Sequence, residues 1–196
     1  MDYPDGATPL DPNELEGLKF PHIQTRSQLD RLEQQNIQEG LKWLASQRKY
    51  NDLLTTEFTK ELHKRLFGLV WKWAGSFRTT EKNIGIDPIN ISVELYKLLE
   101  DARYWIDHHT YPPIEFAARF HHRQVQIHLF PNGNGRHSRI MTDALLEKCL
   151  KERALQWSSE ILAGNPEHRE VYINALRRAD AGDYIQLINF LMGQTS

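Results

Sequence analysis

Residues 128–139 read His-Leu-Phe-Pro-Asn-Gly-Asn-Gly-Arg-His-Ser-Arg, and this stretch determines how the rest of the chain is interpreted. A histidine ends an amphipathic segment, and a Gly-Asn-Gly turn then leads into a new helix. Such a turn presents free backbone N–H groups and the positive end of the helix dipole, which suit phosphate. Arg136 and Arg139 are three residues apart and can face the same side of that helix. The stretch therefore indicates chemistry on a nucleotide phosphate.

Each residue of this stretch has a functional and a structural interpretation. His128 is either a general base or a capping histidine, and the glycine turn beside it favours the base. Phe130 is expected to be a core anchor that fixes the loop. The backbone of Gly133, Asn134 and Gly135 would form an anion cradle, or an ordinary helix start. The cradle favours phosphate binding by Arg136 and Arg139 over two solvated arginines.

The remaining sequence predicts an all-α fold. Asp11-Pro12-Asn13-Glu14 is typical of a short helix that ends near Gly17. Hydrophobic spacing and capping residues predict further helices over about 26–47, 55–73, 92–108, 113–128, 134–151, 166–179 and 182–193. Residues 77–80 and 89–91 are predicted to form short strands around an irregular turn. About seven helices of regular length, besides the short first one, and one small hairpin follow from this pattern.

Composition excludes several classes of protein. The 196 residues fit one domain with a short appendage, and the net charge of −2 without a basic stripe argues against nucleic acid as a direct ligand. Cys149 is the only cysteine, so no intramolecular disulfide is possible, which fits a reducing cytosol. The N-terminus is unlike a signal peptide, and no apolar run is long enough to span a membrane. We therefore expect a cytoplasmic protein.

The motif His128-x-Phe130-x-Asn132-Gly133-Asn134-Gly135-Arg136-x-x-Arg139 resembles that of the Fic/Doc family, in which Asp or Glu usually occupies the position of Asn132. Further segments resemble the bacterial Fic group called mobile mystery protein B, over roughly residues 8–193. They are Gln24-Thr25-Arg26-Ser27, Glu33-Gln34-Gln35-Asn36-Ile37, Trp71-Lys72-Trp73-Ala74-Gly75-Ser76-Phe77-Arg78, Lys82-Asn83-Ile84-Gly85 and Ala179-Asp180-Ala181-Gly182-Asp183-Tyr184.

The resemblance implies a Fic-type helical core with a β-hairpin flap beside the active site. It implies a protein adenylyltransferase that moves AMP from ATP to a hydroxyl of a target protein, with His128 as the base. A small residue at Gly135 is typical of AMP transfer, whereas Doc kinases carry lysine there. The position of Asn132 normally holds Mg²⁺, and an amide oxygen binds that ion without a negative charge.

The resemblance also assigns roles outside the motif. Residues 82–85, which are Lys82, Asn83, Ile84 and Gly85, would form the flap that docks the target by strand addition, or else a plain surface turn. Residues 1–50 would be an N-terminal extension, and residues 51–196 the Fic catalytic domain. The extension carries two candidates for an inhibitory glutamate, Glu33 and Glu39. We prefer Glu33, which would pair with Arg139; the alternative is a solvated helix residue.

Other functions stay open at this point. The chain could transfer or remove another phosphate-linked group. It could also be a catalytically weak nucleotide-binding module, an alternative that the substitution at Asn132 supports. A metal site of His121, His122 and His128 is disfavoured because no carboxylate or cysteine lies near them in the sequence. The oligomeric state is also open, including a homo-oligomer.

Overall fold

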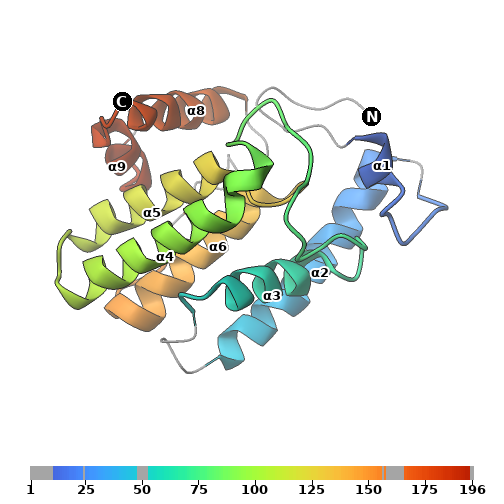
Figure 1. The fold of residues 1–196 in the computed structure, drawn as a ribbon, viewed down its shortest axis with the longest axis horizontal. Helices are drawn as coiled ribbons and strands as arrows, with labels where there is room; N and C mark the ends of the chain where they lie inside the picture. Colours follow the sequence, from blue (N-terminus) through green and yellow to red (C-terminus); the bar gives the residue numbers. More distant parts are fainter. Residues whose placement is uncertain (1–10, 24, 48–52, 156, 158–165, 195–196) are drawn as a thin grey trace.

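The structure is a computed structural model that describes residues 11–23, 25–47, 53–155, 157 and 166–194. Its helices form two groups (Figure 1). One group is α2 (Arg26–Ser46) lying against α3 (Thr56–Phe67), and the other is α4 (Ile91–Asp107), α5 (Pro113–Ile127) and α6 (Asn134–Leu145). Near the C-terminus, α8 (Pro166–Asp180) and α9 (Ile185–Leu191) pack together, and α9 contacts α5. The predicted all-α architecture is confirmed.

Capping residues explain where the N-terminal helices begin. The Thr25 hydroxyl accepts the N–H of Gln28 at 3.3 Å, and the Gln28 side chain accepts the N–H of Thr25 at 3.2 Å. This reciprocal pair satisfies two donors that the first turn of a helix leaves without an internal partner. Asp11 donates its N–H to the Glu14 carboxylate in the same way at the start of α1 (Pro12–Leu15). Both helix starts agree with the prediction.

Two predicted helices end earlier than expected. The helix predicted to reach Trp73 stops at Phe67, with Gly68 as its C-cap. The following backbone instead pairs with the N-terminal segment, where Lys72 donates to the Gly17 carbonyl at 2.8 Å and Lys19 donates to the Val70 carbonyl at 2.9 Å. The regular part of α6 ends at Leu145, and a π-helical segment, η3 (Leu146–Leu150), continues it.

The predicted β-hairpin is not confirmed, and the strand predicted at residues 89–91 was wrong. Pro88–Asn90 form a 3-10 turn, η2, because the Asp87 side chain accepts the N–H of Ile89 at 3.0 Å and Pro88 follows it. Residues 77–87 form a loop without regular structure. In the described part of the chain, the only β-type pairing is the isolated bridge between Leu18 and Trp71.

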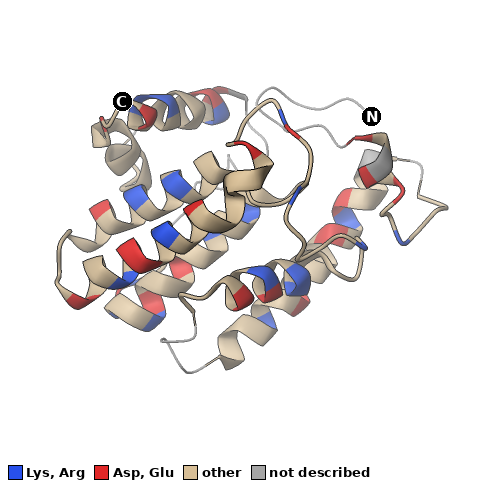
Figure 2. Ribbon diagram, viewed as in Figure 1, with Lys and Arg blue, Asp and Glu red and all other residues tan. Residues whose placement is uncertain are grey.

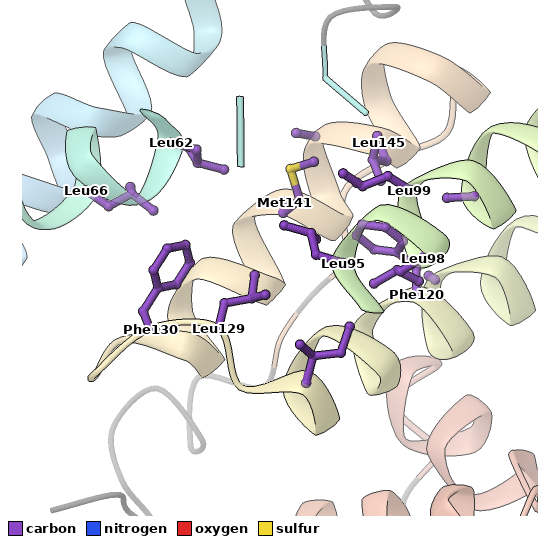
Figure 3. Close-up of a cluster of buried hydrophobic side chains, with 14 of the residues drawn as sticks. Leu62, Leu66, Leu95, Leu98, Leu99, Phe120, Leu129, Phe130, Met141 and Leu145 are labelled. Atoms are coloured by element: carbon purple, nitrogen blue, oxygen red, sulfur yellow. The ribbon is translucent and has the colours of Figure 1, made fainter. Parts of the chain in front are cut away.

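The hydrophobic core runs between the two helix groups and reaches the motif loop (Figure 3). Leu129 and Phe130 are 1% and 0% exposed, and they join the core beside the helix-borne side chains. Burying one such side chain stabilises a fold by about 1.5–3 kcal/mol. The motif loop is therefore anchored by its two apolar residues. The other labelled members of the cluster are Leu62, Leu66, Leu95, Leu98, Leu99, Phe120, Met141 and Leu145.

Charged residues of both signs are interspersed along the helices (Figure 2). No helix in the described ranges has the length and apolar character that crossing a membrane requires. The boundary expected between an N-terminal extension and the catalytic domain, near residue 50, falls among residues 48–52, which lie outside the described residues.

Candidate active site at the start of helix α6

His128 lies at the C-terminal end of α5, in the left-handed conformation with φ 56° and ψ 66°. Such a conformation costs a non-glycine residue about 1–3 kcal/mol, so the surroundings must hold it. Its side chain is buried at 4% exposure. Burial, followed by the positive charges of Arg78 and Lys82, lowers the pKa of His128 to about 4. The imidazole is thus neutral at pH 7, which is the form that can accept a proton.

Phe130 anchors the loop that follows His128. Its ring is fully buried and stacks on the His63 ring, with centroids 3.7 Å apart. The Asn134 side chain accepts the Phe130 N–H at 2.8 Å and donates to the Phe130 carbonyl at 2.7 Å. The expected anchoring role of Phe130 fits this geometry. The Asn134 side chain serves the loop, so any contact of this residue with an anion falls to its main-chain N–H.

His63 ties the same loop to α3, and its sequence context gave no sign of this role. Its Nδ1 accepts the N–H of Gly75 at 3.0 Å, so Nε2 carries the proton and donates to the Asn132 carbonyl at 3.1 Å. Burial holds the pKa of His63 well below its ordinary value, which keeps this single tautomer. The imidazole therefore joins the motif loop to the turn at Gly75.

The two motif glycines are needed for different reasons. Gly133 has φ +78°, and a Cβ on it would lie 2.7 Å from the Phe67 ring. A residue without a side chain is therefore needed here, so that the loop can pack against Phe67 of α3. At Gly135, a Cβ would meet only the Arg139 guanidinium within 4 Å among the described residues, at 3.6 Å. Gly133 is the N-cap of α6 and has no side chain to accept the first N–H groups, which suits an anion there.

The two motif arginines face different neighbours. Arg136 forms an ion pair with Glu33 at 2.6 Å and lies over the Phe67 ring, 4.7 Å from its centroid. Arg139 lies over the Trp157 ring, 5.9 Å from its centroid. The start of α6 therefore carries two guanidiniums, of which Arg136 is directed towards α2 and α3.

The expected pairing of Glu33 with Arg139 was wrong, because its partner is Arg136. The α2 helix lies against α3, and this places Glu33 on the Arg136 side of α6. The Glu33 side chain is 3% exposed and also accepts the Trp71 indole N–H at 2.6 Å, so it is not a solvated helix residue. Glu39 is exposed and pairs with Lys42 at 2.7 Å on the surface of α2.

The residues near Asn132 do not form a magnesium site by themselves. The Asn132 side-chain oxygen accepts the N–H of Gly133 at 2.7 Å, and an Arg136 nitrogen lies 3.5 Å from it. The described residues contain no group of three His, Cys, Asp or Glu side chains able to hold a metal ion. One neutral oxygen beside a guanidinium is a poor site, so Mg²⁺ at this position would depend on phosphate oxygens and water.

The histidines before His128 are occupied by structural contacts. His121 hydrogen bonds to the Ser138 hydroxyl at 2.9 Å and to the Tyr172 hydroxyl at 2.7 Å. His122 bonds to Asp180 at 2.9 Å. These contacts join α5 to α6 and α8.

The residues predicted as a flap divide into two sets. The Lys82 side chain is only 3% exposed and reaches Asp11 at 2.8 Å and Glu14 at 2.5 Å, so it points towards α1. Asn83 and Ile84 are exposed. Gly85 is exposed as well, although a Cβ built on it would lie 2.7 Å from the His128 Cβ. The loop therefore exposes residues 83–85 and turns the Lys82 side chain inward.

Comparison with known proteins relates the chain to one family. A family model described as the Fic/DOC family matches residues 53–146. The chain is 28% identical over 151 residues to a protein adenylyltransferase Fic of Aedes aegypti, covering 72% of this chain and 28% of that protein. It is 28% identical over 177 residues to a protein of the same name from Nematostella vectensis, covering 85% of this chain and 38% of that one. The chain thus spans well under half of these relatives.

Solved structures share the fold. Fic-1 of C. elegans (residues 134–508) matches with a TM-score of 0.69 and 21% identity, covering 91% of this chain and 52% of that one. The BepC protein of Bartonella tribocorum, solved with bound AMPPNP, matches with a TM-score of 0.70 and 17% identity, covering 98% and 95%. At these sequence identities the likeness shows a shared fold and nothing further.

Proposed function

Because the chain belongs to the Fic/DOC family, we propose that it is a protein adenylyltransferase, which moves AMP from ATP to a hydroxyl side chain of another protein. The observation that carries the proposal is the position of a neutral, buried His128 beside a glycine-capped helix start with two arginines. The names of the curated relatives support the same activity. The group assignment to mobile mystery protein B stays a prediction.

In the proposed reaction, His128 takes the proton of the target hydroxyl as its oxygen attacks the α-phosphorus of ATP. The bond from the α-phosphorus to the oxygen that bridges to the β-phosphate breaks, and pyrophosphate leaves with the electron pair. The N–H groups at Gly133–Gly135 and the guanidiniums of Arg136 and Arg139 offset the phosphate charge, so catalysis rests on positioning and electrostatics. Bound Mg²⁺ would add positive charge at the phosphates.

We also propose that Glu33 restrains the activity. Its carboxylate occupies Arg136, one of the two guanidiniums that the reaction assigns to phosphates, at 2.6 Å. A phosphate oxygen and this carboxylate compete for the same donor, so nucleotide binding must overcome the pair. The proposal keeps the inhibitory role inferred for Glu33 and changes the arginine on which it acts.

The target protein is proposed to dock at the loop of residues 82–85. Asn83, Ile84 and Gly85 are the exposed part of this loop, and Ile84 is 42% exposed. An extended target segment that bonds to the loop backbone would bring its hydroxyl towards His128, because Gly85 lies against that residue.

Mass spectrometry of a bacterial lysate incubated with the protein, ATP and Mg²⁺ tests the proposal. We expect an AMP adduct on target protein with the wild type and none with His128→Ala. His22→Ala, which alters an exposed histidine, serves as the matched control and should behave as wild type. A different adduct would point to transfer of another phosphate-linked group. Tight ATP binding with no adduct would point to a nucleotide-binding module.

A further inference from the structure

Arg78 is a buried arginine whose guanidinium donates hydrogen bonds to four main-chain carbonyl oxygens. Its side chain donates to the carbonyls of His128 at 2.6 Å, Ile127 at 3.3 Å, Thr80 at 2.9 Å and Ile86. The residue is 2% exposed. Burying a guanidinium without such donors satisfied would be costly, so these four acceptors account for its position.

The four carbonyls come from two places that are distant in sequence. Two belong to the C-terminal end of α5, where a helix leaves carbonyls without internal partners and favours a positive charge. The other two, those of Thr80 and Ile86, belong to the two ends of the loop 80–86. The Arg78 main-chain N–H also donates to the Leu129 carbonyl at 3.0 Å. Arg78 thus binds the backbone of three consecutive residues centred on His128.

Gly85 provides a second observation at the same place. It has φ +107°, and a Cβ built on it would lie 2.6 Å from an Arg78 guanidinium nitrogen and 2.7 Å from the His128 Cβ. Neither approach leaves room for a side chain. The loop, the guanidinium and the histidine therefore pack directly against one another.

We propose that Arg78 is the positioning residue of His128, which it holds in the left-handed conformation while it fastens the loop 80–86 against it. This inference rests on the proposed function for the role of His128 as the base. A side chain that fixes both the base and the loop beside the target would act on the rate of the chemical step. It would have little effect on the affinity for ATP, because the groups proposed to bind the phosphates lie at the start of α6.

Arg78 also acts on His128 through its charge. After burial, Arg78 is the largest contributor to the lowered pKa of His128, and Lys82 follows. Three carboxylates, Glu14, Glu81 and Asp87, act on Arg78 itself. Removing the Arg78 charge raises the pKa of His128, so the acid limb of the activity profile moves to higher pH. A side chain that only supported the fold would not move this limb.

The test compares Arg78→Gln and Arg78→Lys with the wild type. Arg103→Gln is the matched control, because Arg103 also donates to a main-chain carbonyl, that of Leu54 at 3.0 Å, but far from the motif in sequence. The measurements are kcat and KM for AMP transfer against pH, thermal unfolding, and titration of the His128 ring by NMR.

For Arg78→Gln we expect kcat to fall about 100-fold, the loss that a 1 Å misplacement can cause, with the KM for ATP nearly unchanged. The pKa of His128 should rise together with the acid limb. Arg78→Lys keeps the charge, so the acid limb should stay in place. Its kcat should still fall at least about tenfold, because one ammonium has three donors and lacks the planar fork that spans four carbonyls. Arg103→Gln should match the wild type.

Wild-type kcat in Arg78→Gln would overturn the proposal, as would a lower kcat with an unmoved histidine pKa. If Arg78→Gln does not fold, Arg78→Lys decides, since wild-type kcat in that variant contradicts a positioning role. The NMR titration needs no AMP transfer. If the wild type proves inactive, a raised His128 pKa in Arg78→Gln still supports the coupling, and an unchanged pKa refutes it.

Discussion

Replacing Glu33 by glutamine should tighten ATP binding, because it removes the carboxylate that holds Arg136. Glutamine has the same shape and keeps a carbonyl oxygen for the Trp71 indole N–H, which now donates to Glu33 at 2.6 Å. It also keeps the helix propensity that glycine at this position would lower. The substitution therefore isolates the charge of the Glu33–Arg136 pair from the packing around it.

The size of the effect follows from the pair itself. A hydrogen bond between charged groups contributes about 1.5–3 kcal/mol, equivalent to roughly 10- to 150-fold in a dissociation constant. The Glu33 side chain is 4% exposed but that of Arg136 is 30% exposed, so water screens part of the interaction. We therefore expect the lower end of this range, with about a tenfold lower Kd for ATP.

Isothermal titration calorimetry with ATP and Mg²⁺ would measure this change. Glu39→Gln is the matched control, because Glu39 lies on the same helix and pairs with Lys42 on the surface, where its side chain is 60% exposed. The control should bind ATP as the wild type does, and Glu33→Gln alone should show tighter binding and faster modification of target protein. Equal affinities for all three proteins would refute competition between Glu33 and phosphate for Arg136.

Three further predictions concern the motif loop and the buried histidines. Asn132→Asp should lower the Mg²⁺ concentration that gives half-maximal AMP transfer, since a carboxylate adds charge at the ion; an unchanged requirement in a magnesium titration would contradict this. Gly133→Ala should lower the melting temperature by several degrees, because its Cβ would lie 2.7 Å from the Phe67 ring at φ +78°. Burial lowers the pKa of His121 to about 3 and of His137 to about 4, so unfolding binds protons below pH 6.5, and stability should fall as pH drops from about 6.5 towards 4. Equal calorimetric melting temperatures at pH 7 and pH 5 would count against this.

Local sequence signals were sufficient for most of the helices. Thr25 and Thr55 begin α2 and α3 because a hydroxyl before an amphipathic segment satisfies the first N–H groups. The helix predicted to reach Trp73 stops at its C-cap Gly68, a residue type that often ends helices, but no local pattern contains the pairing that follows it. Its last turn is replaced by backbone pairing with residues 17–19, which are about 50 positions away.

The candidate site shows the same limit. The motif residues were found from the sequence because their types and spacing are distinctive. Arg78 was part of the recognised resemblance, but its role depends on main-chain carbonyls near residue 128, and every residue has a carbonyl. His63 binds the Asn132 carbonyl for the same reason without a signal in the sequence. The partner of Glu33 depends on how α2 is rotated against α6, which helical periodicity alone does not define.

The charges around His128 indicate how the proposed substrate would change the site. Arg78 and Lys82 contribute to its low pKa, and a group with a pKa of about 4 is a weak base at pH 7. A triphosphate bound at the start of α6 would bring several negative charges close to the same ring, which act in the opposite direction and raise this pKa. The same phosphates need Arg136 and so compete with Glu33. Nucleotide binding would therefore strengthen the base and remove the restraint in one step, which links control at Glu33 to chemistry at His128.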